Sequence, residues 1–192
     1  MKRIILALTL TMLFIACEKS DSSKYKSAKK DEYKTVNIRN QVWMAENLNI
    51  KTESSYCYDD NELNCAKYGR LYEWDAAKNA CPSGWHMPSK DEFKTLLATV
   101  GGQKVAGKAL KSESGWNNNG NGANAYFFSA LSAGDRGDKG DYFGEGDYAD
   151  FWTSTEKDDN NAYVMHLHYI ADNASLVGVN KKNGFSLRCL KD

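Results

Sequence analysis

The residues best suited to chemistry are the carboxylates of one Gly-rich stretch, residues 134–147. Flexible loops rich in oxygen atoms can hold Ca²⁺, which accepts about six to eight oxygen ligands. The spacing is not that of an EF-hand, and many acidic loops are merely solvated, so a solvated loop stays open as the alternative. Calcium is the one cofactor that the sequence suggests, and its candidate ligands are Asp135, Asp138 and Asp141.

Aromatic side chains flank this acidic stretch and form a second group of candidates. Aromatic rings beside Asn and Asp side chains suit the faces of sugars or the surfaces of protein partners. The equal alternative is that these rings pack the loops. The candidate ligand-binding residues are therefore the three aspartates together with Trp116, Tyr142 and Tyr148.

Groups for nucleophilic or metal-assisted catalysis are sparse. His166 and His168 are two residues apart on an expected strand and share one face, but no third metal ligand is evident. A pair that is satisfied or exposed is the favoured interpretation. Ser154 lacks the Gly-x-Ser-x-Gly elbow of a hydrolase, and four of the cysteines are expected to be paired. The sequence therefore predicts that the protein is not an enzyme.

The N-terminus has the features of a bacterial lipoprotein signal. Residues 1–16 combine two basic residues with an apolar run that is too short to span a bilayer, which needs about 20 residues. The run ends before Cys17 in a sequence similar to a lipobox, so Cys17 is the expected lipidation site; an ordinary cleaved signal is the alternative. Residues 17–34 read as a flexible tether. Glu18, not Asp, follows Cys17, so by resemblance to sorting rules we expect an outer membrane lipoprotein, held by its lipid and exposed at the cell surface.

Residues 35–192 are expected to form one domain in an oxidising compartment. The chain has 25 basic and 25 acidic residues with no basic patch, which argues against a nucleic acid partner. The four remaining cysteines allow three pairings. Cys57 and Cys65 lie on either side of an Asp- and Asn-rich turn, which indicates a local disulfide.

The helix patterns are few. Apolar residues spaced three and four apart predict a helix over 65–80. Ser89 and Glu92 form a capping box that begins a second helix over 90–100, which Gly101 ends. A short helical turn is expected over 105–110. Trp85, between the two prolines, is expected to be a core anchor between the helices.

The strand patterns dominate the second half of the domain. A first hairpin is expected over 35–44, with its turn near Arg39 and Asn40. Residues 112–125 and 134–147 are expected to be loops. Later strands are expected at 127–131, 151–155, 162–169, 176–179 and 185–190, with the last two joined as a hairpin across residues 180–184. The fold class is therefore α+β.

Six blocks of sequence, in this order, resemble the Fibrobacter succinogenes major paralogous (FISUMP) domain. The resemblance covers essentially all of residues 35–192. The blocks are VWMAENLN at 42–49, YGRLY at 68–72, CPSGWHMP at 81–88, FSAL at 128–131, FWTSTE at 151–156 and SLRC at 186–189.

The resemblance implies a C-type-lectin-like fold, with two helices packed on small antiparallel sheets and a long loop region at 112–148 that would be the binding surface. It also implies that Cys81 pairs with Cys189, as lectin-like domains tie their first helix region to their last strand. The Glu-Pro-Asn and Trp-Asn-Asp signatures of calcium-dependent sugar binding are absent. We expect a lipid-anchored cell-surface protein that binds a glycan or a protein through 112–148; the alternative is a structural or assembly lipoprotein with no small-molecule site.

Overall fold

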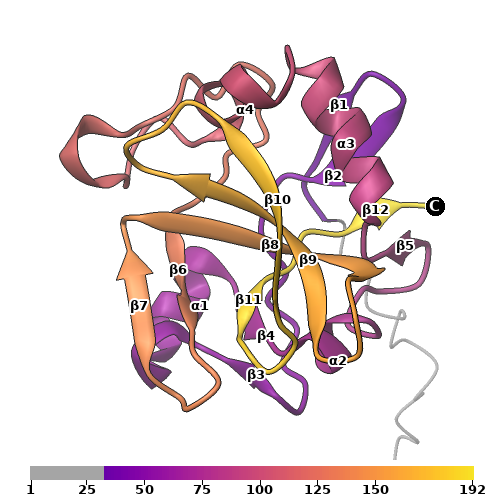
Figure 1. The fold of residues 1–192 in the computed structure, drawn as a ribbon, viewed down its shortest axis with the longest axis vertical. Helices are drawn as coiled ribbons and strands as arrows, with labels where there is room; N and C mark the ends of the chain where they lie inside the picture. Colours follow the sequence, from indigo (N-terminus) through magenta and orange to yellow (C-terminus); the bar gives the residue numbers. More distant parts are fainter. Residues whose placement is uncertain (1–32) are drawn as a thin grey trace, which may run out of the picture. The chain divides into compact units, whose positions relative to one another are not determined.

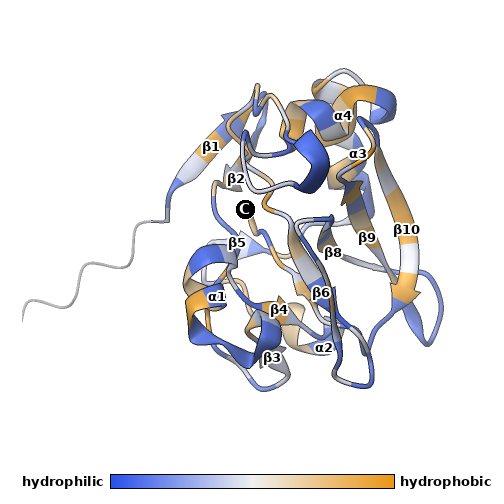
Figure 2. Cartoon of the chain, turned by 90° about the vertical axis from the view of Figure 1, so that its left-hand side faces the viewer, coloured by the Kyte–Doolittle hydropathy of each residue, from blue (hydrophilic) through white to orange (hydrophobic). Residues whose placement is uncertain are grey.

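The structure, a computed structural model, describes residues 33–192, and these form one compact unit. The predicted signal, most of the tether and Cys17 lie outside the described residues. The helices of the described part are α1 (Glu62–Tyr68), α2 (Trp74–Ala77), α3 (Lys90–Thr99) and α4 (Gln103–Leu110), with short 3₁₀ turns at Tyr58–Asp60 and Asn117–Asn119. None of these helices is long and apolar enough to cross a bilayer. Figure 2 shows that α1 and α4 both carry hydrophobic and hydrophilic residues, as expected of helices with one buried side.

The strands form three sheets (Figure 1), and the mixture of sheets and helices confirms the α+β class. The four-stranded sheet has the order β1 (Thr35–Ile38), β2 (Gln41–Met44), β12 (Leu190–Lys191), β5 (Trp85–His86). The six-stranded sheet has the order β10 (Ala174–Asn180), β9 (Asn161–His168), β8 (Tyr148–Glu156), β11 (Phe185–Ser186), β4 (Leu71–Tyr72), β3 (Ser55–Tyr56). The third sheet is the hairpin of β6 (Ala133–Arg136) and β7 (Tyr142–Glu145).

The pair of β8 and β9 divides the core, because each of its faces is covered by a different hydrophobic cluster. Neighbouring residues of a strand point to opposite faces, so Phe151 and Trp152 lie in different clusters. Phe151 packs with residues of α3 and α4, among them Phe93 and Leu110, whereas Trp152 packs with residues of α2 and with Phe185. The central pair of strands is therefore packed on both faces.

The helix predictions were right for α3 and wrong for residues 65–80. The capping box of Ser89 and Glu92 is formed, and α3 and α4 lie where helical structure was expected. The helix expected over 65–80 is instead α1, β4 and α2. Gly69 ends α1 with a φ of +77°, and a Cβ atom there would lie 2.7 Å from Cβ of Asn47. This close approach of two backbones requires glycine and turns the chain into β4.

Several strand predictions need correction. The first hairpin is confirmed, with Arg39 at a φ of +56° in its turn. Residues 134–147, expected to be a loop, contain the β6–β7 hairpin. Residues 127–131 form only one isolated bridge, through Ala130. The hairpin expected across 180–184 does not form, because β10 pairs with β9 while β11 lies between β8 and β4.

Tryptophan burial also differs from the expectation. Trp85 is only half-buried, on the short strand β5, where its ring meets the ring of Tyr33 with centroids 6.2 Å apart. Trp43 and Trp152 are the fully buried tryptophans of the described part. Trp85 therefore covers the edge of the domain and does not anchor its centre.

Two disulfides hold the domain, and both predicted pairings are confirmed. Cys57 and Cys65 join the turn before α1 to the helix itself, with their Cα atoms 4.9 Å apart. Cys81 and Cys189 join positions 108 residues apart in the sequence. The second bond ties the segment before β5 to the segment that enters β12, so it closes most of the domain into one covalent loop.

Candidate functional site

A pocket of about 410 Å³ opens on one face of the six-stranded sheet, beside the β6–β7 hairpin. We call it the hairpin pocket. Its polar side is built by the pairing of β8 with β9, in which Asp150 lies opposite His166 and Tyr148 lies opposite His168. Residues opposite one another in an antiparallel pair share a face, and so do residues two apart. β6 packs against β8 and brings Asp135 to the pocket.

Asp150 and His166 form a hydrogen-bonded pair at the floor of the pocket. Oδ1 of Asp150 lies 2.9 Å from Nδ1 of His166, and Asp150 as a whole is only 6% exposed. The hydrogen bond to this carboxylate raises the pKa of His166 above its ordinary value, against the opposing effect of burial. Nε2 of His166 and Oδ2 of Asp150 make no hydrogen bond with the part of the chain that the structure describes. They remain available to a ligand.

Asp135 is a half-buried carboxylate without a partner. Its side chain forms no hydrogen bond or ion pair within residues 33–192. Burial, and then the neighbouring charge of Asp150, raise its pKa to about 6, while His166 lowers it. Arg136 follows directly but belongs to the other side of the strand, where its guanidinium lies 3.8 Å from the ring centroid of Tyr56. The pocket therefore contains a carboxylate that has lost much of its water and gained no cation.

Tyr148 and the edge of the sheet supply the remaining walls. The ring of Tyr148 packs on His166 and His168, with centroids 5.8 and 4.9 Å away. Gly144 lies against this ring, because a Cβ atom on Gly144 would come within 2.0 Å of it. The hairpin thus rests directly on Tyr148. The opposite wall is apolar apart from one amide, and consists of Val177, Val179, Asn183 and Phe185.

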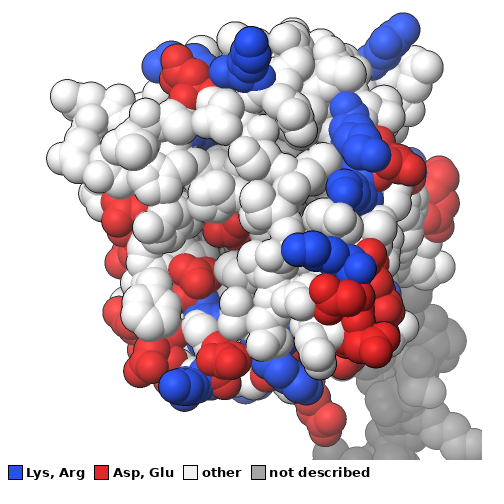
Figure 3. All heavy atoms as spheres, in the orientation of Figure 1, with Lys and Arg blue, Asp and Glu red and all other residues white. Residues whose placement is uncertain are grey.

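The surface around the pocket is uneven in charge. Figure 3, in the orientation of Figure 1, shows acidic side chains gathered over the lower left of the visible face, in the area of β6 and β7, while the centre of that face is mostly uncharged. The carboxylates at the floor of the pocket can accept hydrogen bonds from a ligand or lie beside a positively charged group of that ligand. The pocket can at the same time pack the apolar part of that ligand against β10.

The structure separates the six residues that the sequence proposed for ligand binding. Asp135 and Tyr148 line the hairpin pocket. Asp138 and Asp141 are exposed. Tyr142 is half-buried on β7, where its hydroxyl donates to Asp60 at 2.6 Å.

The choice of Trp116 as a ligand-binding candidate needs correction, because the alternative that these rings pack the loops holds for it. Trp116 is 4% exposed and belongs to the core cluster. Its indole N–H donates to the hydroxyl of Ser112 at 3.0 Å and to the carbonyl of Ala130 at 3.2 Å. Nζ of Lys111, itself bonded to two backbone carbonyls, lies 5.1 Å from the Trp116 ring. The tryptophan therefore packs the loop from within.

The three aspartates proposed to bind calcium do not come together. In residues 33–192 the one group of three potential ligands with atoms within 4.8 Å of one another is Cys57, Glu62 and Cys65. Two of those ligands are the sulfurs of a disulfide, which are not thiolates and do not bind metals. The hairpin separates Asp135, in the pocket, from the exposed Asp138 and Asp141.

Sequence reasoning missed Asp150, although two signals pointed to it. Asp150 stands between Ala149 and Phe151 in the first half of β8, which is otherwise rich in apolar and aromatic residues, and a charge there is costly unless it is paired. The two histidines on one face of the next strand offered the partner. The pairing of β8 with β9 was the missing information, because only the register places His166 opposite Asp150.

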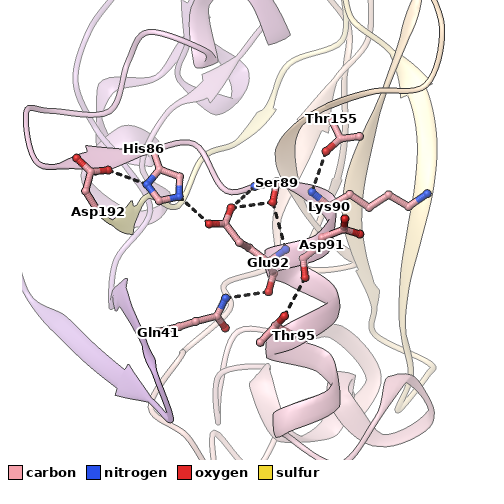
Figure 4. Close-up of polar contacts among 9 residues, drawn as sticks. All are labelled: Gln41, His86, Ser89, Lys90, Asp91, Glu92, Thr95, Thr155 and Asp192. Atoms are coloured by element: carbon pink, nitrogen blue, oxygen red, sulfur yellow. Dashed lines mark hydrogen bonds and ion pairs between the residues drawn. The ribbon is translucent and has the colours of Figure 1, made fainter.

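A second polar cluster lies where β5 meets the start of α3 (Figure 4). His86 lies between two carboxylates: Nδ1 is 2.8 Å from Asp192, and Nε2 is 3.0 Å from Glu92. Glu92 also accepts hydrogen bonds from the backbone and hydroxyl of Ser89, at the start of α3. Burial disfavours the charge on His86, but the two carboxylates outweigh it and raise the pKa. We call this cluster the His86 clasp; every polar atom of the ring is occupied, so it joins β5, α3 and the last residue and leaves no site for a ligand.

These features define an α+β domain that is held by two disulfides and carries a pocket beside its β6–β7 hairpin. The chain belongs to the Fibrobacter succinogenes major domain family (Fib_succ_major), whose model matches residues 36–191. This confirms the family that the six sequence blocks predicted. No curated protein and no solved structure matches the chain.

Proposed function

We propose that this protein is a lipid-anchored lipoprotein of the outer membrane, exposed at the cell surface, whose domain binds a glycan or a protein. We further propose that binding occurs in the hairpin pocket, to which the 112–148 region contributes Asp135 and Tyr148. The observation that carries the proposal is the unpartnered carboxylate of Asp135, half-buried beside the Asp150–His166 pair. Burying a charge without a partner costs stability, and such groups gather at functional sites.

The composition of the pocket supports a binding role. Ligand pockets in proteins are usually apolar, with a few polar groups that fix orientation. Here the apolar wall comes from β10 and Phe185, the aromatic surface from Tyr148, and the polar groups from Asp135 and the Asp150–His166 pair. This combination suits a ligand with both an apolar face and polar or charged groups.

A C-type-lectin-like fold remains part of the proposal. Its support is the arrangement of the termini: the last strand, β12, pairs with β2 of the N-terminal hairpin. The long-range disulfide of Cys81 and Cys189 then ties the region before α3 to this last strand.

We also propose that binding is not followed by catalysis. The cysteines that could serve as nucleophiles in the described domain are paired. His166 makes its one hydrogen bond in residues 33–192 to the carboxylate of Asp150, and no serine, threonine or cysteine there bonds to it. A base without a nearby nucleophile favours a binding role over covalent catalysis.

A structural lipoprotein without a ligand is the second candidate, and the packing of residues 112–130 favours it. Trp116 is buried, and backbone hydrogen bonds run from Gly122 to Ser112 and from Ala125 to Ala109, so this segment is part of the folded body. The case for a ligand therefore depends on the hairpin pocket alone.

The test combines a glycan array with crosslinking to surface proteins, using the full chain. We expect a ligand whose binding is lost in Asp135→Asn and in Tyr148→Ala and kept in Asp141→Asn, the exposed control on the same hairpin. A ligand that binds both pocket variants as well as it binds the wild type would show that the hairpin pocket is not the binding site. A protein partner that crosslinks equally to the wild type and the pocket variants, together with no glycan binding, would favour the structural candidate.

A further inference from the structure

We propose that the hairpin pocket binds an ammonium group carried on an apolar stem, as presented by a lysine side chain of a protein partner. The inference rests on the proposed function, and it names the chemistry that this pocket selects.

The floor of the pocket has an uncompensated negative charge. Asp150 and His166 form a neutral pair when both are ionised, because one charge cancels the other. Asp135 then adds one negative charge, and the charged groups that act on it are Asp150 and His166. Arg136 is occupied by the rings of Tyr56 and Tyr142 on the other side of β6. An ammonium that reaches Asp135 would therefore complete the charge balance of the pocket.

The apolar wall of the pocket can pack against an alkyl chain. β10 is the edge strand of its sheet, and its residues Val177 and Val179 lie beside Val164 and Ala162 of β9, on the same face as His166. Val177 is 38% exposed, although it is a large apolar residue next to a charged floor. A lysine side chain combines a stem of methylene groups with a terminal charge, and it commonly buries the stem while keeping the charge among polar groups.

Neutral sugars fit the same walls less well. Their hydroxyl groups need several donors and acceptors in fixed positions, and apart from its carboxylates the pocket offers Nε2 of His166, the amide of Asn183 and the hydroxyl of Tyr148. A compact ammonium needs only the carboxylates. The observations therefore favour a protein partner with an exposed lysine over a neutral glycan.

The experiment titrates the full chain with small amines and follows the amide and imidazole signals of the pocket by NMR. The probe is Nα-acetyl-lysine methylamide, and its Nε-acetylated form is the neutral control. We expect binding that weakens at least about tenfold on Nε-acetylation and on Asp135→Asn. Asp138→Asn, which removes the same charge from the same hairpin outside the pocket, should leave the affinity unchanged.

A series of n-alkylammonium ions tests the apolar wall separately. Each added methylene that packs on β10 should strengthen binding about three- to fourfold, from the usual free energy of burying one methylene. Val177→Thr, which keeps the shape of the side chain, should reduce this increment and leave the response to Nε-acetylation in place. Equal binding of the charged and acetylated probes would overturn the inference.

Binding measurements with other ligands distinguish a failure of this inference from a failure of the proposed function. Glucosamine that binds in the pocket while the lysine probe does not would assign the ammonium to an amino sugar and overturn the choice of a protein partner. A neutral glycan that binds in the pocket, without any amine, would overturn the inference and keep the proposed function. If neither amines nor glycans nor surface proteins bind in the pocket, both are wrong.

Discussion

Asp135→Asn should make the domain more stable at neutral pH, although it removes a charged residue. The carboxylate has a pKa of about 6 in the folded protein against an ordinary value of 3.8. A carboxyl group whose folded pKa is raised destabilises the native state once it ionises. The penalty is absent below the unfolded pKa, grows between about pH 4 and about pH 6, and is complete above that range. Asparagine has nearly the same shape and no charge, so it avoids the penalty.

The size of the effect follows from the shift. The difference between the two pKa values corresponds to at most about 3 kcal/mol, and because Asp135 is partly exposed, screening by water reduces this to about 1–2 kcal/mol. For a domain of this size, 1 kcal/mol changes Tm by about 2–4 °C. We therefore expect Tm to rise by about 2–8 °C at about pH 7.5 and to change little at about pH 3.5, below the unfolded pKa.

Thermal unfolding of the wild type, Asp135→Asn and Asp138→Asn at both pH values is the assay. Asp138→Asn controls for the loss of one negative charge from the hairpin, and it should leave Tm nearly unchanged at either pH. A gain of stability in Asp135→Asn that is equal at both pH values would show that ionisation is not the cause. A loss of stability at neutral pH would mean that the carboxylate has a partner and is structural.

Three further predictions concern the anchor, the disulfides and the His86 clasp. Cys17→Ser should release the protein from the membrane fraction; a variant that stays membrane-bound, together with a wild type that carries no acyl chain by mass spectrometry, would rule out the lipoprotein. Cys189→Ser should lower Tm and secretion more than Cys65→Ser, because the chain-entropy model gives about 4.8 kcal/mol for the loop of 108 residues and about 2.5 kcal/mol for the loop of 8; the reverse order in thermal unfolding would contradict that reasoning. Because the two carboxylates raise the pKa of His86, the clasp should add stability that is complete below the ordinary pKa of 6.5 and is lost as the pH rises through the higher folded value. His86→Gln should flatten this part of the curve of stability against pH, and an unchanged curve would mean that the clasp does not depend on the charge of His86.

Local signals in the sequence were sufficient for the features that depend on local interactions. The capping box of Ser89 and Glu92 fixed the start of α3, and the turn at Arg39 fixed the first hairpin. The fold class and both disulfides also followed from the sequence and the family resemblance. The helix expected over 65–80 failed because its apolar spacing is compatible with a helix, whereas the contact between Gly69 and Asn47 is tertiary.

The pocket could be predicted only in part, because strand register brings its residues together. Tyr148 and Asp135 were found from their types, but the partner of His166 depends on how β8 and β9 align. Trp116 was misjudged because composition cannot distinguish an aromatic ring that caps a loop from one that binds a ligand. The acidic stretch looked like a metal loop for a similar reason. The hairpin places Asp135 in the pocket and leaves Asp138 and Asp141 exposed, and no periodicity in the sequence indicated that separation.

The most direct test of the account is an NMR titration of the Asp135 carboxyl carbon, without and with the lysine probe. The proposed binding mode requires a free, poorly hydrated carboxylate whose charge a bound ammonium balances. It predicts a pKa of about 6 in the free protein and a clear decrease when the ammonium is bound. A pKa near the ordinary 3.8 that the probe does not change would contradict both the electrostatics of the pocket and its assignment as the binding site.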